Sequence, residues 1–221
     1  MKVSASAILF DFDGTLADSA PDLADAANEM RLARGLEPLP FQALRPAVGS
    51  GARGMLGTAF GVHTGQAEFE LMRDEFLNRY EQRMLLKTRL FDAVALMLDG
   101  LEQRGLRWGI VTNKAQRFAG PMTRSLGLVP RTSVLVCGDS TPYTKPHPAP
   151  LLEGARLLGT APPSCIYVGD DERDVHAGRA AGMGTLAAAW GYLGHGAVIE
   201  GWGADAVLVS PMALLQCLDM T

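Results

Sequence analysis

The sequence contains few cysteines, and nothing in their spacing joins them into a site. Cys137, Cys165 and Cys217 are odd in number and widely separated, and none belongs to a C-x-x-C pair. This arrangement favours neither a disulfide framework nor a zinc site. We therefore expect a reducing, cytoplasmic location. The segment before Asp11 also has too few apolar residues to form the core of a signal peptide.

The sequence also lacks an excess of positive charge and an uninterrupted apolar segment of membrane length. The net charge of -4 and the pI of about 5.6 give no basic footprint for nucleic acid or an anionic membrane. Residues 180–199 carry no charged side chain, but five glycines interrupt any helix there. We read this segment as a buried strand and a loop. The expected partner is a small molecule, and the choice between monomer and homodimer stays open.

Short apolar runs and helical patterns alternate along most of the 221 residues. The runs predict buried strands at 7–10, 108–111, 134–137, 165–168, 185–188 and 206–209. The helical patterns cover 94–104, 115–126, 148–158 and 172–181. Such alternation predicts an α/β fold whose parallel sheet is covered by helices on both faces.

The segment from residue 16 to residue 89 breaks this alternation. Two sets of apolar residues repeat there at helical spacing, with no strand-like run between them. They are Leu23, Ala26, Ala27, Met30 and Ala33, then Phe69, Met72, Phe76, Tyr80 and Met84. We therefore predict a helical insertion over 16–89 and a core made of 1–15 and 90–221.

Polar side chains follow four of the predicted strands at the point where each strand ends. They are Asp11 and Asp13, then Thr112 and Asn113, then Lys145, then Asp170, Asp171 and Asp174. Because ligands of parallel α/β sheets bind outside the carboxyl ends of the strands, we expect these side chains to converge. Mg²⁺ prefers oxygen ligands of this kind, and the ammonium suits a phosphate ester.

In this order, the residues resemble the four motifs of the haloacid dehalogenase superfamily. Asp11-Phe12-Asp13-Gly14-Thr15 matches the first motif, Thr112 the second, Lys145 before Pro146 the third, and Gly169-Asp170-Asp171 through Asp174 the fourth. The resemblance covers the whole predicted core and implies a doubly wound, Rossmann-like sheet. The helical insertion resembles the cap of the subfamily that includes phosphoglycolate phosphatases and β-phosphoglucomutases.

The resemblance implies phosphoryl transfer to Asp11, with Mg²⁺ as the cofactor. Asp11 would attack phosphorus in line, because Mg²⁺ and Lys145 neutralise the charge of the phosphate. Asp13 would protonate the leaving alkoxide and later deprotonate the attacking water, while its backbone carbonyl helps to hold the metal. Asp170 would complete the metal ligands, which are then Asp11, Asp13 and Asp170.

The other motif residues would hold the phosphoryl group or support the metal ligands. Thr112 and backbone amides near Phe12 and Asn113 would bind phosphoryl oxygens. Three further residues are expected to position metal-bound waters or Lys145 without binding the metal themselves. They are Thr15, Asp171 and Asp174.

Residues 49–54, Gly-Ser-Gly-Ala-Arg-Gly, match the dinucleotide-binding pattern G-x-G-x-x-G. We reject a dinucleotide site, because no clear strand precedes Gly49 and Glu70 lies in a helical pattern. In the resembled family the cap loop at this place faces the active site and selects the substrate. Gly51 and Arg53 are therefore expected to bind the substrate, with Arg117 assisting. An exposed arginine without such a role is the alternative for Arg53 and Arg117.

The resemblance predicts a Mg²⁺-dependent phosphatase for a small phosphorylated metabolite, with 2-phosphoglycolate as the leading substrate. Asp13 favours an oxygen leaving group, and Thr15 leans toward a phosphatase rather than a mutase. Segments 49–60, 108–128 and 169–182, with 203–205, also resemble N-acetylmuramic acid 6-phosphate phosphatases, which are the principal alternative. Two further functions stay open, namely a phosphosugar mutase and a non-catalytic regulatory protein that kept the fold.

Overall fold

The computed structural model describes residues 5–132, 134–194 and 196–218, so residues 1–4, 133, 195 and 219–221 of the predicted core lie outside it. Its main sheet has six strands in the order β5-β4-β1-β6-β7-β8, and every neighbouring pair is parallel. The strands are β1 (Ala7–Phe10), β4 (Arg107–Val111), β5 (Leu135–Val136), β6 (Cys165–Gly169), β7 (Gly184–Ala188) and β8 (Ala206–Leu208). The predicted α/β class and parallel sheet are confirmed.

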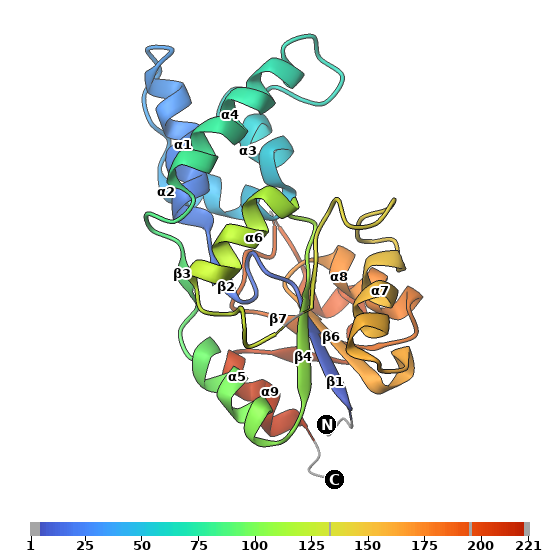
Figure 1. The fold of residues 1–221 in the computed structure, drawn as a ribbon. Coiled ribbons are helices and arrows are strands. Elements are labelled where there is room, and N and C mark those ends of the chain that lie inside the picture. Colours follow the sequence, from blue (N-terminus) through green and yellow to red (C-terminus); the bar gives the residue numbers. More distant parts are fainter. Residues whose placement is uncertain (1–4, 133, 195, 219–221) are drawn as a thin grey trace.

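Successive residues of the central strand point into different apolar layers, as the alternation of a strand requires. In β1, Ile8 and Phe10 belong to one buried cluster with Leu214, whereas Ala7 and Leu9 belong to another with Leu151. The first cluster lies under α5 (Val94–Gln103) and α9 (Pro211–Cys217), and the second lies under α7 (Ala149–Leu158) and α8 (Glu172–Ala180). Figure 1 shows these helix pairs on opposite sides of the sheet. The helix α6 (Gln116–Ser125) follows β4.

The predicted helical insertion follows β1. The strands β2 (Ala17–Asp18) and β3 (Arg89–Leu90) pair antiparallel where the chain leaves and re-enters the core. Between them lie α1 (Ala20–Leu32), α2 (Phe41–Leu44), the 3₁₀ helix η1 (Arg45–Ser50), α3 (Gly51–Phe60) and α4 (Phe69–Arg83). The residues predicted for the two apolar faces are buried except Ala33, which is exposed just after α1, and α1 and α4 pack against each other. Figure 1 shows the insertion standing above the core.

Several elements differ from the prediction. The segment read as a loop at 49–54 becomes helix α3 at Gly51, and its Met55, Leu56 and Ala59 are buried. Three glycines within α3 weaken its helical signal. Gly54 is needed there, because a Cβ would overlap the carbonyl oxygen of Ala47. The short helices α2, η1 and α9 were not predicted either.

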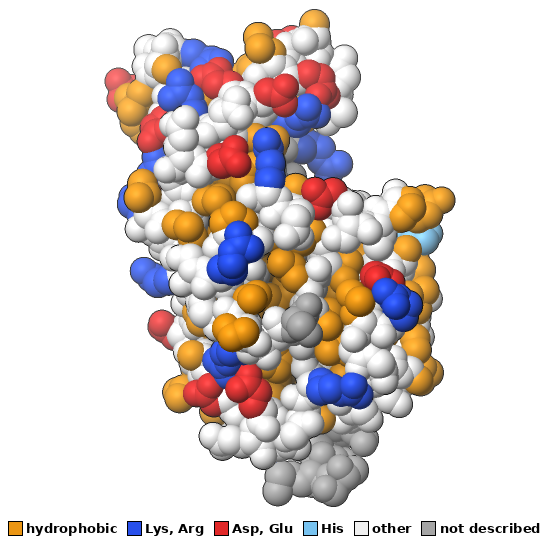
Figure 2. All heavy atoms as spheres, in the orientation of Figure 1, with side chains coloured by type: hydrophobic (Ala, Val, Ile, Leu, Met, Phe, Trp, Pro, Cys, Tyr) orange, Lys and Arg blue, Asp and Glu red, His pale blue; other side chains and the backbone are white. Residues whose placement is uncertain are grey.

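The segment without charged side chains behaves as predicted. It contains β7 and then a loop in the described part, and no helix among the described residues is both long and apolar enough to cross a bilayer. On the face drawn in Figure 2, acidic and basic side chains are interspersed, without a large basic patch.

Candidate active site

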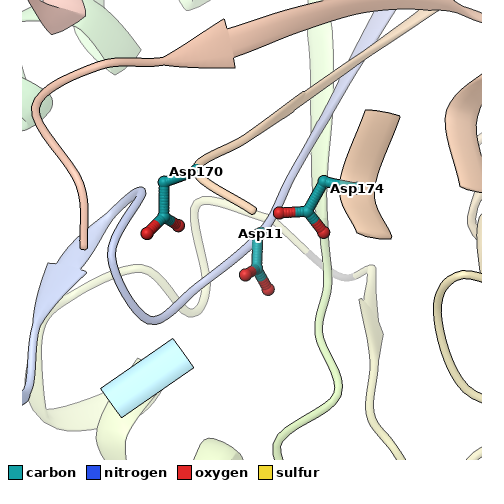
Figure 3. Close-up of side chains that lie close together, drawn as sticks. All are labelled: Asp11, Asp170 and Asp174. Carbon is teal, nitrogen blue, oxygen red and sulfur yellow. The ribbon is translucent and has the colours of Figure 1, made fainter. Parts of the chain in front are cut away.

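The carboxyl edge of the sheet brings the motif carboxylates together. Asp11 directly follows β1, Asp170 follows β6, and Asp174 lies in the first turn of α8. One carboxylate oxygen of each lies within 4.8 Å of the others. Figure 3 shows the three side chains grouped beyond the end of β1. The convergence predicted for these residues is therefore present in the structure.

Lys145 lies between two of these carboxylates and is almost fully buried. Its Nζ is 2.8 Å from Asp11 Oδ1 and 2.7 Å from Asp174 Oδ1. Burial alone would lower the pKa of Lys145, but the charges of Asp11 and Asp174 outweigh burial and raise it. Lys145 is therefore a fixed positive charge beside the Asp11 carboxylate.

Two side chains fix the position of Lys145. The Asn113 side chain accepts a hydrogen bond from the Lys145 backbone N–H (2.8 Å) and donates one to its carbonyl (2.9 Å). The hydroxyl of Tyr167, in the middle of β6, accepts a hydrogen bond from Lys145 Nζ (2.7 Å) and donates one to the Val111 carbonyl (2.6 Å). Tyr167 was not predicted as a site residue, because a tyrosine within an apolar run reads as core.

Two hydrogen-bond donors from different segments hold the Asp170 carboxylate in place. It accepts hydrogen bonds from the Thr15 hydroxyl (2.9 Å) and from the backbone N–H of Tyr192 (2.8 Å). Gly14 and Gly191 press against its carboxylate so closely that a Cβ at either position would overlap it. Burial first, and then the charges of Asp11 and Asp174, raise the pKa of Asp170 well above its ordinary value.

Asp174 and Asp171 take different positions at the start of α8. They form a capping box, in which Asp171 accepts from the Arg173 backbone N–H and Asp174 accepts from the Asp171 backbone N–H. The Asp171 carboxylate also pairs with the Arg173 guanidinium, with Oδ1 2.7 Å from Nε. Asp171 is thus paired outside the carboxylate cluster, whereas Asp174 lies within it.

The donor set fits a divalent cation. Asp11, Asp170 and Asp174 offer three clustered carboxylates, and Lys145 is the single ammonium that contacts the cluster among the described residues. Burial first, and then the charges of the neighbouring carboxylates, raise the pKa of Asp174 as well as that of Asp170. A hard cation with oxygen ligands would compensate the charge of these carboxylates. The backbone carbonyl of Asp13 as a further ligand stays a prediction.

The Asp13 side chain points to a different set of partners. It accepts a hydrogen bond from the Ser19 hydroxyl, and its Oδ2 lies 3.1 Å from Lys114 Nζ. Lys114 Nζ also donates to the hydroxyl of Tyr80, on α4 of the insertion, at 2.9 Å. Burial would lower the pKa of Lys114, but the nearby Asp13 and Tyr80 raise it. Lys114 was not predicted, although it follows Thr112 and Asn113 at the same strand end.

A cavity of about 320 Å³ lies between the core and the insertion and includes these residues. Its charged end holds Asp11, Asp13, Lys114, Lys145, Asp170, Asp171, Arg173 and Asp174, and Thr112 and Asn113 adjoin them. Apolar and aromatic side chains make up much of the rest of the lining, and the rings of Tyr80 and Phe118 lie beside the Lys114 ammonium. These residues are mainly Leu23, Val48, Ala52, Phe76, Leu77, Tyr80, Ala115 and Phe118. Gly51 and Arg117 also line the cavity. Arg53 is exposed and is not among the lining residues.

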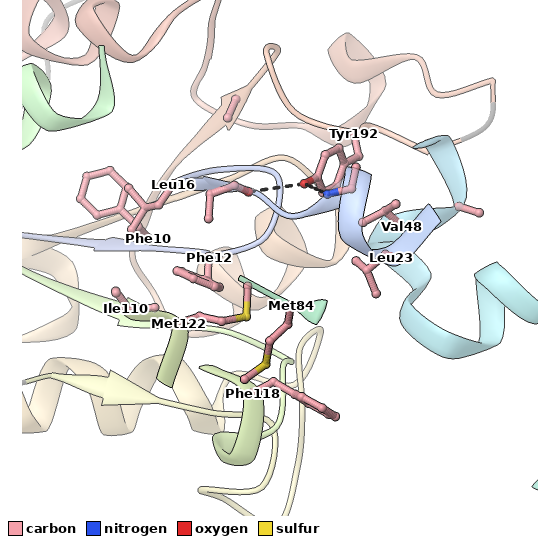
Figure 4. Close-up of a cluster of buried hydrophobic side chains, with 14 of the residues drawn as sticks. Phe10, Phe12, Leu16, Leu23, Val48, Met84, Ile110, Phe118, Met122 and Tyr192 are labelled. Carbon is pink, nitrogen blue, oxygen red and sulfur yellow. Dashed lines mark hydrogen bonds between the residues drawn. The ribbon is translucent and has the colours of Figure 1, made fainter. Parts of the chain in front are cut away.

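Contacts across the boundary connect the insertion with the catalytic edge. The Tyr192 hydroxyl accepts hydrogen bonds from the backbone N–H groups of Ser19 (2.8 Å) and Ala20 (3.0 Å) at the start of α1. Arg45 donates to the Gly191 carbonyl, and Arg173 donates to the Gly49 carbonyl. Figure 4 shows the apolar side chains that pack between the sheet and the insertion, with the hydrogen bonds of Tyr192 dashed. The structure therefore has the insertion docked over the site.

Comparisons with known proteins agree with this geometry. The haloacid dehalogenase-like hydrolase family matches residues 8–188. A phosphoglycolate phosphatase of Xanthomonas campestris is 47% identical over 95% of this chain and 95% of its own. An N-acetylmuramic acid 6-phosphate phosphatase of Pseudomonas aeruginosa is 41% identical over 99% of this chain and 96% of its own.

A solved structure shows the same architecture. A predicted phosphoglycolate phosphatase from Haemophilus somnus superposes with a TM-score of 0.84 and 26% identity, covering 97% of this chain and 98% of the other. The match therefore spans both the core and the insertion. The chain belongs to the haloacid dehalogenase-like hydrolases and is a phosphatase of that family, a phosphoric monoester hydrolase.

Proposed function

We propose that the protein hydrolyses a small phosphate monoester in two steps through an aspartyl-phosphate at Asp11, with Mg²⁺ as cofactor. The observation that carries this proposal is the placement of Asp11 beside Lys145, Asp170 and Asp174 at the end of β1. A partly exposed carboxylate can reach a substrate in the cavity, and the groups behind it are charged and held in place.

In the first step, an Asp11 carboxylate oxygen forms a bond to phosphorus as the bond to the ester oxygen breaks. Lys145 offsets the negative charge that would repel the two anions. The Thr112 hydroxyl and backbone N–H groups near Phe12 and Asn113 bind phosphoryl oxygens. Asp11, Asp170 and Asp174 would hold Mg²⁺, which supplies further charge neutralisation and orients the phosphoryl group.

Asp13 moves the protons in both steps. In the first step it gives a proton to the departing alkoxide. In the second step it takes a proton from water as the water oxygen bonds to phosphorus and the bond to Asp11 breaks. The products are an alcohol and inorganic phosphate, and Asp11 and Asp13 return to their starting states.

The leading substrate is 2-phosphoglycolate. It is the substrate named for the Xanthomonas campestris relative, with 47% identity over nearly the full length of both chains. The molecule carries a second anionic group near its ester oxygen, and Lys114 offers a cation beside Asp13. Charge complementarity therefore supports this substrate.

One observation favours N-acetylmuramic acid 6-phosphate as the second candidate. The cavity has an extended apolar wall, which includes Phe76, Leu77 and Phe118. The two carbons of glycolate leave most of such a wall without a contact, whereas the acetyl and lactyl methyl groups of the larger sugar could cover it. No comparable observation favours a phosphosugar mutase.

Steady-state phosphate release tests the function. We would compare 2-phosphoglycolate, N-acetylmuramic acid 6-phosphate and glucose 6-phosphate, with Mg²⁺ and with a chelator, and we expect one substrate to exceed the others in kcat/KM by at least about tenfold. Thr64→Ala, at an exposed threonine outside the cavity, serves as the control variant. Formation of an isomeric sugar phosphate without phosphate release would support a mutase instead.

A further inference from the structure

The Lys114 ammonium lies beside Asp13 in the lining of the cavity. An ammonium carries three N–H donors. Nζ lies 3.1 and 3.2 Å from the oxygens of the Asp13 carboxylate and 2.9 Å from the Tyr80 hydroxyl. Both Asp13 oxygens and the Tyr80 hydroxyl therefore lie within hydrogen-bond distance of Nζ, and no other residue that the structure describes supplies an acceptor there. Because Lys114 and Asp13 both line the cavity, an anionic group of a bound molecule can take the place of one of the two Asp13 oxygens as a partner of Nζ.

The surroundings of Lys114 strengthen its interaction with an anion. Its side chain is only 8% exposed. The ammonium lies 4.6 Å from the ring centre of Tyr80 and 5.9 Å from that of Phe118. Phe76 stacks on Tyr80. Aromatic side chains thus exclude water from the ammonium, and a charge is screened less in such a place than at the surface.

Lys114 is itself paired with Asp13, and the other cations that line the cavity differ from it in position or exposure. Lys145 is paired with Asp11 and Asp174. Arg173 is paired with Asp171. Arg117 is exposed and lies over the ring of Phe118, so solvent screens its charge. Lys114 lies next to Asp13, the residue that gives a proton to the leaving oxygen.

We propose that Lys114 determines specificity by binding a carboxylate attached to the carbon next to the ester oxygen, and that Tyr80 positions the Lys114 ammonium from the insertion. The inference rests on the proposed function, because Asp13 marks where the ester oxygen lies. The ligand class is a phosphate monoester of a 2-hydroxy acid. The binding site for its carboxylate is complete only when α4 is docked on the core, since Tyr80 comes from α4 and Lys114 from the loop after β4.

The test compares two esters that differ at one group. In 2-hydroxyethyl phosphate, a hydroxymethyl group replaces the carboxylate of 2-phosphoglycolate. We would measure kcat/KM for both, and also their competitive inhibition constants against p-nitrophenyl phosphate. We expect Lys114→Met to reduce the preference for 2-phosphoglycolate by about 10- to 100-fold. Arg124→Met is the matched control, because it removes an exposed cation of α6 that is not among the cavity-lining residues, and it should change the preference by less than about threefold.

Tyr80→Phe tests the positioning role, since it removes one hydroxyl and keeps the ring. We expect it to reduce the preference by about 3- to 10-fold in the wild-type background and to have no further effect in Lys114→Met. An additive effect of the two substitutions would contradict a role for Tyr80 through Lys114.

The failure of this inference can be told from failure of the proposed function. If the wild type shows no preference between the two esters, or if Lys114→Met keeps the preference, the assignment to Lys114 is wrong. Phosphatase activity that still depends on Asp11 would leave the proposed chemistry intact in that case. If the wild type hydrolyses none of the three phosphate esters, the proposed function and the inference both fail.

Discussion

Tyr167→Phe removes a single oxygen from the interior and leaves the ring in place. That oxygen connects Lys145 Nζ at 2.7 Å with the Val111 carbonyl at 2.6 Å, and the side chain is fully buried. The substitution therefore isolates one question, which is whether the lysine needs a neutral partner in addition to its carboxylates.

The structure sets the size of the expected effect. Losing the hydroxyl leaves an ammonium donor and a buried carbonyl each with one partner fewer, and such a loss costs about 1–3 kcal/mol. Lys145 Nζ lies 3.3 Å from the Val111 carbonyl and can move closer to it, which limits the loss and displaces the ammonium from Asp11. For a chain of this size the loss corresponds to a decrease in Tm of roughly 2–12 °C. Displacement of the ammonium should reduce kcat by about 10- to 100-fold.

Thermal unfolding and steady-state phosphate release would be measured on the same preparations. Tyr143→Phe is the matched control, because Tyr143 is 56% exposed and its ring stacks on His147 without using the hydroxyl in a described hydrogen bond. The control should keep Tm and kcat unchanged. A Tyr167→Phe protein with wild-type Tm and wild-type kcat would refute the positioning role of the hydroxyl.

Three further predictions follow from the same contacts. Burial and the neighbouring carboxylates raise the pKa of Asp170, so the folded state binds a proton more readily than the unfolded chain does. The metal-free protein should therefore lose stability as the pH rises from the ordinary aspartate range toward the raised pKa. Mg²⁺ competes with that proton, so the increase in Tm with MgCl₂ should be larger at about pH 8 than at about pH 5, and Asp170→Asn should abolish it. Gly191→Ala should weaken Mg²⁺ binding by at least about tenfold in calorimetry, because the added Cβ would overlap the Asp170 carboxylate. Gly201→Ala is the control and should leave Mg²⁺ binding unchanged, because no atom lies within 4 Å of its added Cβ. Arg53→Ala should lower kcat/KM by less than about twofold, because Arg53 is exposed outside the cavity lining; a tenfold loss would instead support the substrate role predicted for it from the sequence.

The sequence predicted the sheet well because its strands are short apolar runs, four of which are followed by the polar motif residues. The run at 7–10 coincides with β1, and the helical pattern at 172–181 agrees with α8 within one residue. The convergence of Asp11, Lys145 and Asp170 followed from the parallel direction of the strands. These features depend on local patterns and on one general rule of topology.

Other parts of the site depend on contacts between distant segments, which no local pattern contains. Tyr80 reads as one apolar position of a helix, and only the docking of α4 places its hydroxyl on Lys114. Tyr192 lies in a glycine-rich loop, yet its N–H binds Asp170 and its hydroxyl binds the start of α1. The helix α3 was missed because its glycines, which allow close packing in the insertion, also weaken its helical pattern.

The most direct test of the proposed chemistry is to identify the phosphorylated residue. Wild-type protein would be mixed with its best substrate and Mg²⁺, quenched in acid within the first turnover, and digested for mass spectrometry. We expect one phosphoryl group on the peptide that contains Asp11, and neither phosphorylation nor phosphate release in Asp11→Asn. Phosphate release that persists in Asp11→Asn, or a phosphoryl group trapped on another residue, would contradict the central claim.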